Sequence, residues 1–247
     1  MGCIWSSDTT FERSQRIDQM IKQEAERKNN KKELEILIIG TKYSGKSTLL
    51  KHIRTMFGVE DGSDVHNESD FNSTVKAQFS FSDIQFKVIS WTGEMPRNRR
   101  LLHYFESVMA IIFIVDISIY DQFNDNDPPK NILTESMELY GTVCNNKYFE
   151  DKCLILFFSK TDTFEEKIRT IALNSYFPEY CGTDTLEEAV SYIQSKFKVL
   201  NKTGREMYTR DVCMADTKDD SLVTEAVTDV IMKSYEKVPH DWIGGMF

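Results

Sequence analysis

The feature that most constrains the fold is a glycine-bearing loop, Gly40 to Thr48, which lies between an apolar run and a helical pattern. The loop matches G-x-x-x-x-G-K-[ST]; residues 34–39 before it predict a buried strand, and residues 46–57 after it predict a helix. Glycines allow the backbone to wrap around an anion, and the free N–H groups of a helix start point at it. The sequence therefore predicts a phosphate loop at the edge of an α/β fold.

The motif residues of this phosphate loop (residues 40–48) suit the binding of phosphate. We expect Lys46 to reach the terminal phosphates and the Ser47 hydroxyl to bind magnesium. The alternative is an ordinary Gly/Ser turn before a helix, which the flanking strand and helix disfavour. The candidate phosphate-binding residues are Gly40, Tyr43, Ser44, Gly45, Lys46, Ser47 and Thr48.

The rest of the chain alternates strand and helix patterns. The predicted strands cover 77–81, 84–91, 110–116, 153–158 and 207–214, and the first two form a hairpin. Two predicted helices end near residues 106 and 144, and two others cover 186–200 and 221–237. Alternation of this kind predicts an α/β, doubly wound, mostly parallel sheet that is covered on both faces. Ligands then bind at the carboxyl ends of the strands, where Gly40, Trp91, Ser159 and Met214 lie.

Composition excludes several functional classes. The net charge of -9 argues against nucleic acid as the main partner, and five cysteines without paired spacing favour a reducing compartment. The longest apolar run, residues 108–115, is too short to span a bilayer, so we expect no membrane-crossing segment.

The N-terminus predicts a lipid anchor instead. Residues 1–6 fit M-G-x-x-x-[ST], which favours myristoylation of Gly2, and Cys3 beside it can accept palmitate. Basic residues and a thin apolar stripe over 9–32 predict an amphipathic helix that lies on a membrane or on a partner surface. The alternatives are a chance Gly-Cys start and a solvated helix.

A second motif follows the predicted strand 153–158. Ser159-Lys160-Thr161-Asp162, here called the base loop, resembles the [NT]-K-x-D element of GTP-binding proteins. By that resemblance Asp162 accepts two hydrogen bonds from guanine, Lys160 lies along the base, and Ser159 belongs to the same contact set. A common surface turn is the alternative, and the nearby phosphate loop disfavours it.

Taken together, the chain resembles the heterotrimeric G-protein alpha subunits. The resemblance implies a Ras-like GTPase domain over 33–247 after an N-terminal helix over 1–32, with GTP/GDP and Mg2+ as ligands. It also implies a beta-gamma dimer, a G-protein-coupled receptor and an effector as partners, at the cytoplasmic face of the plasma membrane. Beyond the phosphate loop, the stretches that resemble the family are residues 2–3, 12–14, 17–18, 103–106, 144–147, 164–168, 178–180, 226–231 and 245–247.

The departures from the family concern the nucleotide site. Only the loop 58–73 stands where family members insert an all-helical domain, and Lys42 and Tyr43 replace a Gly and a Glu of the phosphate loop. Alignment of the first switch places Phe71 at the magnesium-binding threonine and Glu68 at the catalytic arginine, unless Ser73 or Thr74 serves the metal.

The second switch and the third base contact are altered too. Ser90 replaces an aspartate, Glu94 stands at the catalytic glutamine, and Gly93 keeps the N–H that meets the terminal phosphate. Met214 stands at the residue whose N–H meets the guanine oxygen. The sequence therefore predicts a nucleotide pocket that survives in outline and weak or absent GTP hydrolysis.

Two other functions remain open at this stage. One is a nucleotide-independent adaptor that holds a beta-gamma dimer or a receptor. The other is an ATP-dependent phosphate-loop enzyme, since an apolar strand ends at Asp116, as in enzymes with a metal-binding aspartate. Asp162 and the family stretches disfavour this last hypothesis.

Overall fold

The computed structural model describes residues 32–56, 75–81, 84–92, 105, 108–204 and 207–212. The predicted N-terminal helix, the loop 58–73, the helix ending near Glu106 and the closing helix 221–237 lie outside these residues. The described part contains the phosphate loop, the base loop and the strands between them.

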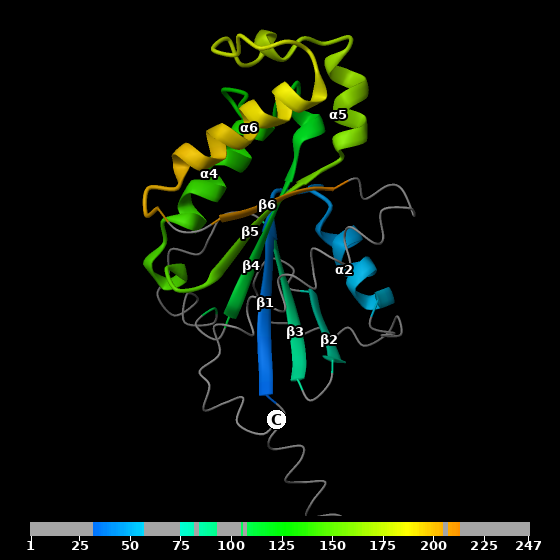
Figure 1. The fold of residues 1–247 in the computed structure, drawn as a ribbon, viewed down its shortest axis with the longest axis vertical. Coiled ribbons are helices and arrows are strands. Elements are labelled where there is room, and N and C mark those ends of the chain that lie inside the picture. The colour runs from blue at the N-terminus through cyan, green and yellow to red at the C-terminus, as the bar shows by residue number, and fades with distance from the viewer. Residues whose placement is uncertain are drawn as a thin grey trace, which may run out of the picture.

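The centre of the fold is a six-stranded sheet with the order β2-β3-β1-β4-β5-β6 (Figure 1). Strand β2 is antiparallel to β3, and the other neighbouring strands are parallel, so the predicted mostly parallel sheet and its hairpin are confirmed. The strands are β1 (Lys32–Gly40), β2 (Val75–Phe81), β3 (Ile84–Thr92), β4 (Val108–Asp116), β5 (Cys153–Ser159) and β6 (Met207–Val212).

Helices connect the strands and cover both faces of the sheet. They are α2 (Lys46–Met56), α4 (Ile132–Cys144), α5 (Thr161–Ile168) and α6 (Leu186–Leu200), with short 3-10 turns η1 (Ile117–Ile119), η2 (Lys147–Phe149) and η3 (Leu173–Ser175). Helices α2, α4 and α6 agree with the sequence prediction. Helix α5 was not predicted, although its Phe164 and Ile168, four positions apart, are both buried.

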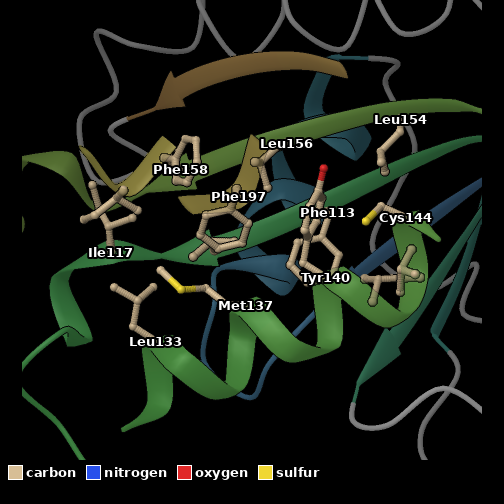
Figure 2. Packing of buried hydrophobic residues seen from close by; sticks show 14 of the residues in the cluster. Phe113, Ile117, Leu133, Met137, Tyr140, Cys144, Leu154, Leu156, Phe158 and Phe197 are labelled. Atoms are coloured by element: carbon tan, nitrogen blue, oxygen red, sulfur yellow. The ribbon is translucent and has the colours of Figure 1, made fainter. Parts of the chain in front are cut away.

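The main core lies between the sheet and helices α4 and α6. One face of α4 carries Leu133, Met137, Tyr140 and Cys144, at helical spacing, and Figure 2 shows these side chains directed toward β4, β5 and Phe197 of α6. The Tyr140 ring meets Phe113 of β4 and Phe197 edge-on, with centroids 5.2 and 5.1 Å apart. These aromatic contacts fix how α4 and α6 sit on the sheet.

The opposite face of the sheet is also buried. Alternate residues of β1 and β4, such as Ile38 and Ile112, are fully buried without belonging to the core under α4 and α6. Helix α2, whose Leu49 and Ile53 are buried, lies on the other side of the sheet from α4 and α6 (Figure 1). Burial on both faces explains why β1, β4 and β5 are continuous apolar runs rather than alternating ones.

The side chain of Asn145 joins the ends of α4 and α6. Its Nδ2 donates to the backbone oxygens of Gly141 (2.7 Å) and Leu200 (2.8 Å), and its Oδ1 accepts from the Lys202 N–H (2.9 Å). Because Gly141 belongs to α4 and Leu200 ends α6, this amide closes the last turns of both helices.

The sheet brings the candidate site residues to one edge. Strand β1 pairs with β3 on one side and with β4 on the other, so the strand order reverses at β1, which is the topological switch point of the sheet. Gly40 ends β1 opposite Thr92, and Asp116 ends β4 opposite Ser159. Ligands of open α/β sheets bind at such an edge.

Candidate functional site

Glycine is required where β1 turns into the phosphate loop. A Cβ at Gly40 would lie 2.5 Å from the backbone oxygen of Ile114 and 2.5 Å from Ser44 Oγ. Farther along, Gly45 has φ 101° and Tyr43 has φ 66°, both in the left-handed region. The loop is thus a tight backbone turn held against β4, with its apex at Tyr43.

Lys46 is folded beneath this loop. Its Nζ donates to the backbone oxygens of Gly40 (2.9 Å) and Thr41 (2.5 Å) and, at 3.4 Å, to Ser44 Oγ. Burial lowers the pKa of Lys46 to about 8. Three protein acceptors within the phosphate loop therefore hold the ammonium in place.

The start of α2 presents two hydroxyls that are open to a ligand. Ser47 and Thr48 are exposed, whereas Ser44 and Lys46 are buried. The first helical bond runs from the Leu49 N–H to the Gly45 oxygen at 2.9 Å. The loop therefore places its polar groups at a helix start, which favours anions.

Lys42 and Tyr43 form a pair at the apex of the loop. Tyr43 is 76% exposed, and Lys42 Nζ lies 4.9 Å from the centre of its ring. The Lys42 ammonium is thus held over an exposed aromatic ring.

The base loop is anchored to the phosphate loop through Ser159. Its fully buried hydroxyl lies within hydrogen-bond distance of the Ser44 oxygen (2.8 Å) and the Val115 oxygen (3.1 Å). In the structure, backbone oxygens of the phosphate loop and β4 engage the hydroxyl of Ser159, which was predicted as a guanine-binding residue. Sequence reasoning also missed Ser136 of α4, whose Oγ lies 3.1 Å from Thr41 Oγ1 and supports the loop from the other side.

Asp162 lies in the first turn of α5. Its Oδ1 is buried and has no hydrogen-bond partner among the residues that the structure describes. A buried carboxylate oxygen without a donor is costly, so such an atom indicates a place where a ligand donates hydrogen bonds.

Asp116 does not behave as a metal-binding aspartate. Its Oδ1 accepts from the Ser118 N–H (2.9 Å) and Ser118 Oγ (2.6 Å), and its Oδ2 pairs with Lys160 Nζ (2.5 Å). Both oxygens are engaged by protein donors, which removes the observation that favoured an ATP-dependent enzyme.

The fit of this edge to magnesium is incomplete. Ser47 offers an exposed hydroxyl, but Ser90 of β3, where the family has an aspartate, is buried and contributes no carboxylate. Within the described ranges, no group of three or more His, Cys, Asp or Glu side chains is placed to hold a metal. Mg2+ sites usually combine one or two carboxylates with substrate phosphates.

Five predicted site residues lie outside the described residues: Gly2, Cys3, Gly93, Glu94 and Met214.

In the part of the chain that is described, no helix has the length and apolarity needed to cross a bilayer. A shallow depression of about 520 Å³ lies beside α6 and is lined by Tyr180, Glu188 and Tyr192. It shares no residue with the phosphate loop or the base loop.

One comparison with known proteins bears on this arrangement. A family model described as "G-protein alpha subunit" matches residues 65–231, which is about two thirds of the chain. The match includes β2 to β6 and the base loop but begins after the phosphate loop. The two nucleotide-site motifs are therefore supported independently, one by the family match and the other by its own sequence and geometry.

Proposed function

Because this chain belongs to the G-protein alpha subunit family, we propose that it is a membrane-anchored guanine-nucleotide-binding signal transducer with weak or absent GTP hydrolysis. Family membership supports nucleotide binding and a transducer role. The preference for guanine, the loss of hydrolysis, the anchor and the partners are the proposed parts.

The observation that carries the proposal is the buried Oδ1 of Asp162 without a protein donor. Guanine presents two adjacent N–H donors, on N1 and on the 2-amino group, to a carboxylate in this position. Adenine has no such pair, so Oδ1 would remain buried without a donor, which disfavours adenine nucleotides.

At the other end of the site, contacts within the protein hold the phosphate loop in its conformation. Lys46 is held by the Gly40 and Thr41 oxygens, and Gly40 leaves no room for a side chain. Ser159 ties this loop to the base loop, so the spacing between the phosphate end and the base end is fixed by the sheet. Such preorganisation reduces the entropy lost on binding.

The residues that would promote hydrolysis are poorly represented. Hydrolysis requires a positioned water, a metal and positive charge on the transition state, and an arginine in this role is worth roughly 10³–10⁵ in rate. This chain supplies the three requirements poorly. It has Glu94 at the position of the water-orienting glutamine, Ser90 at the aspartate position and Glu68 at the arginine position. Bound Mg2+ would stabilise phosphate charge; on this chain only Ser47 is proposed as its ligand.

The anchor and partners follow from the family and the N-terminus. We propose acylation at Gly2 and Cys3, the cytoplasmic face of the plasma membrane as location, and a beta-gamma dimer, a receptor and an effector as partners.

A binding experiment tests this function against a nucleotide-independent adaptor. Calorimetric titration of the full chain with GDP, a non-hydrolysable GTP analogue and ADP, with and without Mg2+, should show binding of the guanine nucleotides only. Asp162→Asn should lower the preference for guanine about 10- to 100-fold. Glu187→Gln, in the exposed first turn of α6, is the matched control and should bind like the parent.

Two outcomes would refute the proposal. Equal affinity of the parent for GDP and ADP would remove the role of Asp162. Absence of nucleotide binding in a folded parent that still captures a beta-gamma dimer would establish the adaptor function instead.

A further inference from the structure

Asp116 is a buried carboxylate at the ligand-binding edge that neither nucleotide motif contains. It ends β4 directly opposite Ser159, the first residue of the base loop. Its side chain is 1% exposed. An anion in such a place is costly unless it is paired and hydrogen-bonded, so its partners show what it does there.

The two oxygens of Asp116 have separate partners. Oδ1 is held by the backbone N–H and the hydroxyl of Ser118, which fixes the carboxylate at the start of η1. Oδ2 is then left for Lys160 Nζ, 2.5 Å away. The Lys160 side chain is 41% exposed, so a well-fixed buried anion holds a side chain that would otherwise move in solvent.

Lys160 also has a strained backbone. It adopts φ 59° and ψ 42°, the left-handed conformation, at the junction between β5 and α5. For a residue with a side chain this conformation is unfavourable, and such residues concentrate at functional sites. Because the Lys160 oxygen accepts the Phe164 N–H at 3.0 Å, this same residue determines how α5 begins.

Asp162 lies two residues after Lys160, in that first turn. The direction of its carboxylate therefore depends on the conformation of Lys160. The Asp116–Lys160 pair restrains Lys160 at its ammonium, and Ser159 restrains the preceding residue at the phosphate loop. Together they hold the base loop from both sides.

We propose that Asp116 is a positioning residue for base recognition, which holds Lys160 so that the base loop is formed before a nucleotide binds. This inference rests on the proposed binding of guanine nucleotides. It adds a residue outside the recognised motifs and assigns it an effect on base affinity and selectivity rather than on phosphate binding.

A second ion pair on α5 provides a matched control. Lys167 Nζ bonds to Asp121 Oδ1 at 2.8 Å and to the Ser118 oxygen at 2.9 Å, so it joins α5 to the same segment after β4. Asp121→Asn breaks a comparable pair on the same helix but away from Lys160. Asp116→Asn keeps an oxygen for Ser118 and removes the charge that holds Lys160.

The first measurement needs no nucleotide. Trace labelling of lysine amines in the folded full chain, read by mass spectrometry, should find Lys160 protected in the parent. Asp116→Asn should increase Lys160 labelling several-fold and leave Lys167 unchanged, whereas Asp121→Asn should do the reverse. Equal labelling of Lys160 in the parent and in Asp116→Asn would overturn the inference.

The second measurement is the affinity for GDP, IDP and pyrophosphate. Asp116→Asn should weaken GDP binding about tenfold, reduce the GDP-to-IDP ratio, and leave pyrophosphate binding within about twofold. IDP lacks the 2-amino group, so this ratio reports the alignment of the base loop. Asp121→Asn should match the parent in all three.

A double-mutant cycle covers the case in which Asp116→Asn folds poorly. Because the Lys160 side chain is partly exposed, Lys160→Met retains a place for its stem, and the pair Asp116→Asn/Lys160→Met leaves no buried charge. If Asp116 acts through Lys160, the double variant should bind GDP no more weakly than Lys160→Met alone. Additive losses, or pyrophosphate binding that falls as much as GDP binding, would refute the positioning role.

Failure of the proposed function gives a different pattern. If labelling of Lys160 responds to Asp116→Asn but the parent binds pyrophosphate and no guanine nucleotide, the ion pair exists while guanine binding, and with it the positioning role, is refuted.

Discussion

The Ser159 hydroxyl lies 2.8 Å from the backbone oxygen of Ser44, which joins the base loop to the phosphate loop across 115 sequence positions. Neither residue is exposed, so this contact is a fixed part of the site rather than a surface contact. It makes the two ends of the predicted nucleotide pocket dependent on each other.

Removal of this hydroxyl should weaken both ends of the site. Ser159→Ala leaves the buried Ser44 oxygen without this donor and should lower the free energy of unfolding by about 1–3 kcal/mol. GDP and pyrophosphate affinities should both fall, which distinguishes this variant from Asp116→Asn. Thermal denaturation and calorimetry measure the two effects, with exposed Ser195→Ala as control. Unchanged pyrophosphate affinity would show that the loops are independent.

Two glycines should respond in opposite ways to alanine. Gly40→Ala forces a Cβ to within 2.5 Å of a backbone oxygen, so we expect a loss of at least about 1–3 kcal/mol in stability. In α4, the nearest atom to a Cβ at Gly141 is 3.9 Å away, so Gly141→Ala should stabilise the helix by about 0.5–1 kcal/mol. Urea denaturation measures both. Destabilisation by Gly141→Ala would contradict the packing around α4.

Lys46 should make stability depend on pH. Its pKa is about 8 when folded and has its ordinary value of 10.5 when unfolded, so the unfolded chain binds more protons between these pH values. The contribution of Lys46 to the free energy of unfolding therefore increases as pH rises from about 8 to about 10.5. Below about pH 8 both states are protonated, and the full cost of burying the charge opposes folding.

The measurement is urea denaturation over that pH range. Lys46→Met should lack the rise that the parent shows, and Lys51→Met, at an exposed position of the same helix, should keep it. Identical pH profiles for the parent and Lys46→Met would mean that Lys46 keeps an ordinary pKa.

Hydrolysis should be far slower than in a family member with a complete site. In single-turnover assays, Glu94→Gln should not restore the rate, because a metal carboxylate and an arginine are still missing. Ser90→Asp should increase the effect of Mg2+ on GTP-analogue affinity, since it restores a carboxylate at the position where the family has an aspartate. Release of labelled GDP should be fast. Ordinary family turnover with slow GDP release would refute this prediction.

Acylation should determine where the protein resides. Gly2→Ala should move it from the membrane fraction to the cytosol, and Cys3→Ser should weaken its retention partially, because one acyl chain binds only marginally. Cell fractionation of tagged variants measures the distribution. A Gly2→Ala variant that stays on the membrane would show that another part of the chain anchors it.

Local patterns predicted most of the fold. The apolar runs that became β1, β4 and β5, the hairpin of β2 and β3, and the helices α4 and α6 all have a period or a run length that sequence alone reveals. Helix α5 was missed because its eight residues carry only two buried apolar side chains, and polar residues separate them. A longer amphipathic pattern would have made it visible.

The site was predicted in part for a different reason. The phosphate loop and the base loop are contiguous motifs, so their residue types and order were sufficient. The contacts of Asp116 with Lys160 and of Ser159 with Ser44 join residues 44 and 115 positions apart, and only the strand register brings them together. The disfavoured hypothesis of an ATP-dependent enzyme had likened Asp116 to a metal-binding aspartate, and it loses that support because protein donors engage both oxygens.

The amide of Asn145 has a consequence for how the molecule opens. Since it bonds to Gly141 in α4 and to Leu200 at the end of α6, neither helix can fray at this end without breaking the contact of the other. Hydrogen–deuterium exchange should therefore report the final turns of α4 and α6 as one cooperative unit with a common opening free energy. A partner that binds to either helix would then change the hydrogen-exchange protection of both helices.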